Sequence, residues 1–142
     1  MLLIAALVAG CGGSSDETQP LQDAQPFADA FVDRLVADGR WAAIEGDLSA
    51  QLRQPMRDFQ ATIRRNGVRR VRGPGALRHD CPPNEVVPEA GKDCFVYRLE
   101  GRQAVLVAGV RRLRARFRLW VEPQEGTWQV INYDYEVLPS MR

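Results

Sequence analysis

The sequence has little of several residue types that mark common kinds of functional site. His79 is the single histidine, Lys92 is the single lysine, and there are three cysteines. No histidine, cysteine or carboxylate grouping has the spacing of a zinc site or a catalytic set. No apolar run reaches the roughly 20 residues that cross a bilayer, and a formal net charge of +1 argues against a simple nucleic-acid binder. We therefore expect no metal, no cofactor and no nucleic-acid partner.

The composition that remains is that of one globular domain. The chain has 142 residues, of which 45% are hydrophobic and 26% charged, enough to bury a core. The charges are distributed unevenly. Residues 16–47 carry eight acids against two arginines, 57–78 carry seven arginines against Asp58, and 111–118 carry five arginines. Two interpretations stay open: the segments neutralise one another, or the arginines form an anion or phospholipid-headgroup patch.

The first ten residues, MLLIAALVAG, are continuously apolar but too short to span a membrane. Residues 8–11, Val-Ala-Gly-Cys, resemble the lipobox of bacterial lipoproteins. This resemblance implies cleavage before Cys11 and a lipid on its thiol, which would anchor an exported chain to the cell membrane or envelope. The alternative is an ordinary signal peptide without the lipid. Residues 11–25 are rich in Gly, Ser, Asp and Gln and predict a flexible tether.

Helical patterns follow the tether. Pro26 predicts the start of an amphipathic helix that ends at Asp38-Gly39. A short helical segment is expected over 41–48. A further helix is expected from Pro55, with Met56, Phe59 and Ile63 on one face, to Asn66-Gly67.

Cys81 and Cys94 bracket a proline-containing loop. With Cys11 assigned to lipid, an even pair remains in an exported chain, so these two predict a disulfide. A metal site with His79, or a reactive thiol, is the alternative.

The rest of the chain predicts strands. Val68–Arg72 reads as a short edge strand broken by Gly73-Pro74-Gly75. Alternation at 95–100, a turn at Gly101-Arg102 and an apolar run over 103–110 predict two more strands. Residues 111–122 alternate between apolar residues and an arginine ladder, and 127–137 form the last strand. The last strand changes parity, which predicts a bulge near Asn132.

Helices followed by an antiparallel meander indicate an α+β domain over 26–138. The FADAFVDRLVADGRWAA opening and the EGTWQVINYD ending resemble the nuclear transport factor 2-like superfamily, including its SnoaL-like members. The resemblance implies a curved sheet wrapped around helices to form a cone. It also implies an apolar pocket, for which the candidate lining residues are Phe31, Trp41, Phe59 and Phe117.

Members of that superfamily include isomerases, dehydratases and hydrolases as well as binding and assembly modules. An enzyme would need a pocket carboxylate, and the weak candidates are Asp134 and Tyr133. Each residue could instead have an ordinary structural role, Asp134 in a cross-strand ion pair and Tyr133 in the core. We therefore favour a module that binds a small apolar ligand or an envelope protein, with an enzyme or a purely structural role as alternatives.

Overall fold

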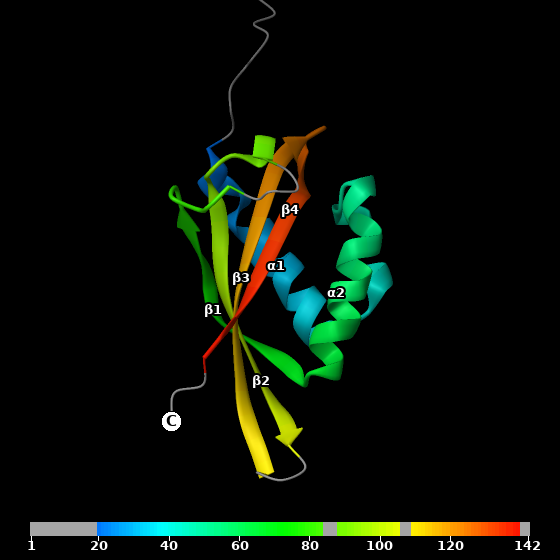
Figure 1. The fold of residues 1–142 in the computed structure, drawn as a ribbon. Helices are drawn as coiled ribbons and strands as arrows, with labels where there is room; N and C mark the ends of the chain where they lie inside the picture. The colour runs from blue at the N-terminus through cyan, green and yellow to red at the C-terminus, as the bar shows by residue number, and fades with distance from the viewer. Residues whose placement is uncertain (1–19, 84–87, 106–108, 140–142) are drawn as a thin grey trace, which may run out of the picture.

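The computed structural model describes residues 20–83, 88–105 and 109–139. Two helices precede a four-stranded antiparallel sheet of order β1-β2-β3-β4, which is curved and does not close (Figure 1). The predicted α+β class is confirmed, and the arrangement is consistent with a nuclear transport factor 2-like cone. The predicted signal segment, Cys11 and residues 12–19 of the tether lie outside the described residues, and the prediction of a flexible tether is wrong for 21–25, which form a 3-10 turn and the start of the first helix. Within the described ranges, no helix is long and apolar enough to cross a membrane.

The first helix is α1 (Gln25–Asp33), preceded by a 3-10 turn η1 (Leu21–Ala24) and continued by a π-helical turn η2 (Arg34–Asp38). Ala24 is fully buried, so packing begins before Pro26. The predicted glycine stop is confirmed, because Gly39 adopts a φ of 67° that an L-residue with a side chain rarely tolerates. The buried face of this segment consists of Ala28, Phe31, Val32, Leu35 and Val36.

Short 3-10 turns, η3 (Trp41–Ala43), η4 (Glu45–Asp47) and η5 (Ala50–Leu52), lead into α2 (Arg53–Arg65). This helix begins two positions before the predicted Pro55. A proline fits there because the first-turn amides of a helix have no intrahelical acceptor to lose. Met56, Phe59 and Ile63 are buried on one face, as their spacing predicts.

Strand β1 (Val68–Arg78) is longer than predicted. The Gly-Pro-Gly segment at 73–75 does not end the strand but forms an irregularity, since the pairing with β2 shifts between Arg72 and Ala76. Side chains of α1 bond the backbone left unpaired at this point: Gln25 Nε2 donates to Gly75 O (2.8 Å), and Gly75 N donates to Asp29 Oδ1 (3.0 Å). A side chain at Gly75 would also collide with the ring of Tyr97.

The predicted turn at Gly101-Arg102 is wrong, and so is the separate strand over 103–110. Strand β2 (Cys94–Val105) runs through both residues and pairs with β3 (Gly109–Gln124) up to Val105 and Gly109. Gly101 is needed for a different reason. A Cβ at Gly101 would run into the backbone of Gly67 and Val68, where β1 begins. Gly101 thus permits a close approach of two strands rather than a reversal.

Strand β4 (Thr127–Leu138) follows a tight turn at Glu125-Gly126, where both φ angles are positive, at 44° and 79°. The bulge predicted near Asn132 is confirmed. Trp120 pairs with Asn132 while the next residue, Val121, pairs with Val130, which leaves Ile131 as the extra residue. The bulge allows Val130 and Tyr133 to pack against the same main core.

The two faces of the sheet differ. The inner face packs on the helices, and its aromatic side chains gather around Phe59, whose ring centroid lies 5.4 Å from Phe117, 5.3 Å from Tyr133 and 4.7 Å from Tyr135. The outer face carries a smaller buried cluster of Cys81, Cys94 and Trp120. Cys81 and Cys94 form the predicted disulfide. Trp120 Nε1 donates to Gly91 O (3.1 Å), which fixes the loop to the sheet.

Candidate functional site

The four predicted pocket residues lie on the inner side of the sheet. Phe31, Phe59 and Phe117 are at most 4% exposed and belong to one continuous core. Trp41 is half-buried at the margin of that core, and the guanidinium of Arg57 lies 5.8 Å from its ring centroid. These side chains occupy the interior of the cone as packing residues.

The two weak catalytic candidates, Asp134 and Tyr133, are neighbours on β4 and therefore point to opposite faces. Tyr133 packs its ring, tilted by 41°, against Phe59 inside. Asp134 lies on the outer face, where Arg118 Nη1 donates to both of its carboxylate oxygens (3.0 and 3.2 Å). Burial is the main cause that raises the pKa of Asp134, with a further contribution from Glu136, although the charge and hydrogen bonds of Arg118 act in the opposite direction. The structure therefore does not bring these two residues together, and it places the carboxylate in an ion pair outside the cone.

The outer face contains a row of like charges that crosses three strands. The register places Arg98 of β2 directly opposite Arg72 of β1 on one side and Arg116 of β3 on the other. Residues in such positions have Cβ atoms about 4.5–5.5 Å apart, and like charges directly opposite are destabilising. We call Arg72, Arg98 and Arg116 the arginine row.

Both ends of the arginine row have carboxylate partners. Arg72 Nη1 lies 3.1 Å from Glu100 Oε1, and Arg116 Nη1 lies 3.4 Å from Glu136 Oε2. Arg118, in the next position along β3, pairs with Asp134 and also lies 3.7 Å from Glu136. The expectation that acids on neighbouring strands neutralise the ladder is thus confirmed for Arg116 and Arg118.

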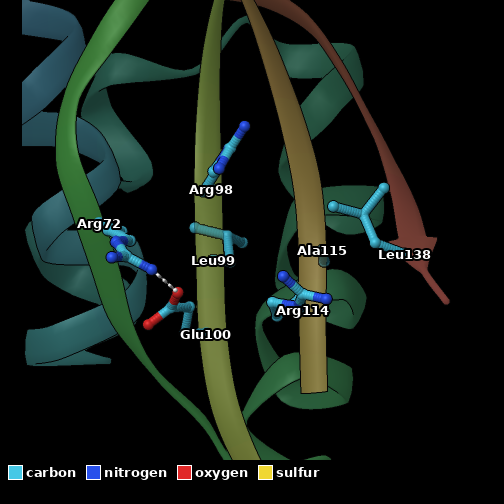
Figure 2. Close-up of a pocket in the computed structure, with 7 residues that line it drawn as sticks. All are labelled: Arg72, Arg98, Leu99, Glu100, Arg114, Ala115 and Leu138. Carbon is cyan, nitrogen blue, oxygen red and sulfur yellow. Dashed lines mark hydrogen bonds and ion pairs between the residues drawn. The ribbon is translucent and has the colours of Figure 1, made fainter. Parts of the chain in front are cut away.

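Arg98 and Arg114 differ from these, since neither forms an ion pair or hydrogen bond with the described parts of the chain. Figure 2 shows Arg72 turned toward Glu100, while the Arg98 side chain extends away from both and meets no partner among the residues drawn. Arg114 stands across from Glu100 in the sheet register, but that carboxylate is bonded to Arg72. The centre of the arginine row is therefore a cation without a counter-charge among the described residues.

An open groove of about 510 Å³ lies over this face. Its lining comes from three strands and the loop after β1, and it comprises Arg72, Pro74, Ala76, Arg78, Asp80, Cys81, Pro82, Val96, Arg98, Arg116 and Arg118. The disulfide forms part of one wall through Cys81. Asp80 is the only acid among the described residues of the lining, and it lies 3.5 Å from Arg78. A smaller hollow of about 30 Å³, the one in Figure 2, adjoins the groove at Arg72 and Arg98 and also includes Arg114.

The sequence identified the ladder of β3 but missed the arginines of the other strands. Arg72, Arg78 and Arg98 lie 13 or more residues before the ladder, and only the strand register joins them to it. The alternation of Arg98 and Glu100 with buried Tyr97 and Leu99 was the available signal.

Metal binding finds no support in the part of the chain that the structure describes, because no three His, Cys, Asp or Glu side chains gather there. His79 is exposed, and its Nδ1 lies 2.9 Å from Asp93 Oδ1. The residues of the alternative metal site are thus committed to an ion pair and to a disulfide.

Comparison with known proteins supplies no family for this chain. A scan against protein-family models finds no match, and a search of curated proteins finds none either. The functional argument therefore depends on the site alone.

Proposed function

We propose that this chain is an exported, lipid-anchored protein of the cell envelope, whose nuclear transport factor 2-like domain is a binding module. The lipobox-like residues 8–11 and the polar tether support the anchor. The Cys81–Cys94 disulfide supports export, because such bonds persist in oxidising compartments and are rare in the cytosol.

The observation that carries the binding role is the arginine-lined groove on the outer face. The inner face is covered by helices and packed with aromatic side chains. The outer face instead presents an open hollow with a cation, Arg98, that has no ion-pair partner in the described parts of the chain. We infer that a partner binds from outside the sheet rather than inside the cone.

No specific observation supports the alternative of a proton-transfer enzyme. Its candidate carboxylate, Asp134, lies on the outer face and both its oxygens accept hydrogen bonds from Arg118. A general base must lie within hydrogen-bond reach of the substrate proton, and Asp134 is on the face of the sheet opposite the predicted inner pocket.

The anchor is tested by mass spectrometry of the mature chain purified from bacterial membranes. We expect a chain that begins at Cys11 and carries a diacylglyceryl group, with Cys11→Ser as the unlipidated control. A wild-type chain that keeps residues 1–10, or that carries no lipid on Cys11, would contradict the proposal.

A further inference from the structure

We propose that the arginine row is a binding site for a phosphoryl group, with Arg98 as its central ligand. The inference rests on the proposed function in one respect, since it takes the outer groove as the binding surface and names the chemical group that binds there.

The position of Arg98 is the first argument. It lies between two other arginines in the register of the sheet, and the carboxylates that serve those two lie to either side, at Glu100 and Glu136. A cross-strand trio of guanidinium groups is unfavourable without anions, so a bound anion at the centre would relieve a repulsion built into the fold.

The charge balance of the groove is the second argument. Six arginines line the two adjoining hollows, namely Arg72, Arg78, Arg98, Arg114, Arg116 and Arg118. Four of them pair with Asp80, Glu100, Asp134 and Glu136. Among the described lining residues, the two left over, Arg98 and Arg114, give an excess of two positive charges, which matches one phosphate dianion or the phosphates of two neighbouring lipid headgroups.

The rigidity of the surroundings is the third argument. Arg118 is only 16% exposed and is held by the two hydrogen bonds that it donates to Asp134, so the floor of the groove is fixed. One wall is fixed by the disulfide at Cys81. Guanidinium groups present planar forks of N–H donors that fit phosphoryl oxygens, and a preformed site loses little side-chain entropy when it binds them.

Inorganic phosphate is the first probe, titrated into the Cys11→Ser chain and followed by calorimetry and by the melting temperature. Sodium chloride at matched ionic strength serves as the reference. We expect phosphate to bind and to raise the melting temperature, and Arg98→Gln to weaken binding about tenfold or more. Arg53→Gln is the matched control, because Arg53 is an exposed arginine on α2, away from the groove.

A second measurement distinguishes a binding role of Arg98 from a purely structural one. Without phosphate, Arg98→Gln should melt at the same temperature as the parent or higher, since the substitution removes one of three like charges. A lower melting temperature, with phosphate binding unchanged, would contradict the proposal.

Vesicles of phosphatidylglycerol, with phosphatidylcholine as the reference lipid, are the second probe in the same Cys11→Ser background. Arg98-dependent binding to the anionic vesicles identifies the phosphoryl group as a membrane headgroup, whereas Arg98-dependent binding of phosphate alone identifies a soluble phosphorylated compound. If neither probe binds, or if Arg98→Gln binds both as tightly as the parent, the site does not exist. Such a result would not contradict the proposed lipid anchor at Cys11. Likewise, finding no lipid on Cys11 would not contradict the proposed phosphoryl site.

Discussion

Tyr97 of β2 donates a hydrogen bond of 2.8 Å from its hydroxyl to Asp29 Oδ1 on α1. The same oxygen accepts from Gln25 Nε2 (2.8 Å) and from Gly75 N (3.0 Å). One carboxylate oxygen therefore joins the first helix, the irregular segment of β1 and the second strand. This junction lies between the helical layer and the edge of the sheet.

Asp29→Ala should destabilise the domain by about 2–4 kcal/mol, because it removes the acceptor of three hydrogen bonds and leaves the hydroxyl of the buried Tyr97 without one. Tyr97→Phe removes a single donor and should cost about 1 kcal/mol. Urea unfolding followed by circular dichroism measures both. Equal losses for the two variants would mean that Asp29 does not act as a shared acceptor.

The buried tyrosines predict a loss of stability at alkaline pH. Burial, and then the bond to Asp29, raise the pKa of Tyr97 well above its usual range. Burial, and then the nearby Tyr135, raise the pKa of Tyr133 to about 12. In the unfolded chain both titrate near the ordinary value of 10.0. Because the folded pKa is raised, the stabilising contribution is complete below pH 10 and is lost as the pH rises through the folded pKa.

We therefore expect the melting temperature to fall as the pH rises from about 10 to 12, and to fall less steeply in Tyr133→Phe. Tyr135→Phe is the comparison variant, because Tyr135 is 47% exposed and its ring packs against the same Phe59 ring. It removes only one of the smaller effects that raise the pKa of Tyr133, so its slope should lie closer to that of the parent. The proposal for Tyr133 would be wrong if the parent and Tyr133→Phe showed the same slope over this range.

The disulfide should contribute about 3 kcal/mol through the loop that it closes. The two cysteines are 13 residues apart, and the loop between them is also held to the sheet by the Trp120 hydrogen bond to Gly91. Replacing Cys81 and Cys94 together with alanine in the Cys11→Ser background should lower the free energy of unfolding by that amount. A reducing agent should produce a similar loss in the parent and none in the double variant. Equal midpoints for the parent with and without the reducing agent would contradict this.

The two outer-face ion pairs of β4 should differ in strength. The side chains of Arg118 and Asp134 are 16% and 28% exposed, whereas those of Arg116 and Glu136 are 43% and 56% exposed. Asp134→Ala leaves a half-buried guanidinium without its main partner and should cost about 1–2 kcal/mol, against about 0.5 kcal/mol or less for Glu136→Ala. Chemical denaturation of both variants measures the difference. Equal losses would mean that burial does not strengthen the Arg118 pair.

The sequence could predict the features that depend on local pattern. Alternation along 111–122 identified the buried face of β3 and its arginine ladder, and the change of parity in β4 located the bulge at Ile131. The three-residue and four-residue spacing of Met56, Phe59 and Ile63 identified the buried face of α2.

Features that depend on partners distant in sequence could not be predicted in this way. Gly101 was interpreted as a turn, and the glycines of 73–75 as a break, because a glycine required for close approach looks the same in sequence as a glycine in a reversal. The arginine row could not be predicted for a similar reason. Arg72, Arg98 and Arg116 belong to three strands, and only the register brings them into line.

The order of the strands in the sheet is also their order in the chain, so every strand pairs with a sequence neighbour. Closing such hairpins costs less loop entropy than joining distant segments, which favours rapid folding of the sheet. The contacts between segments more distant in the sequence are those from the first helix to β1 and from Leu48 to Val130, and we expect them to form later. We therefore expect fast local strand pairing and a later docking of the first helix on β1, with Asp29 among the last residues to find its partners.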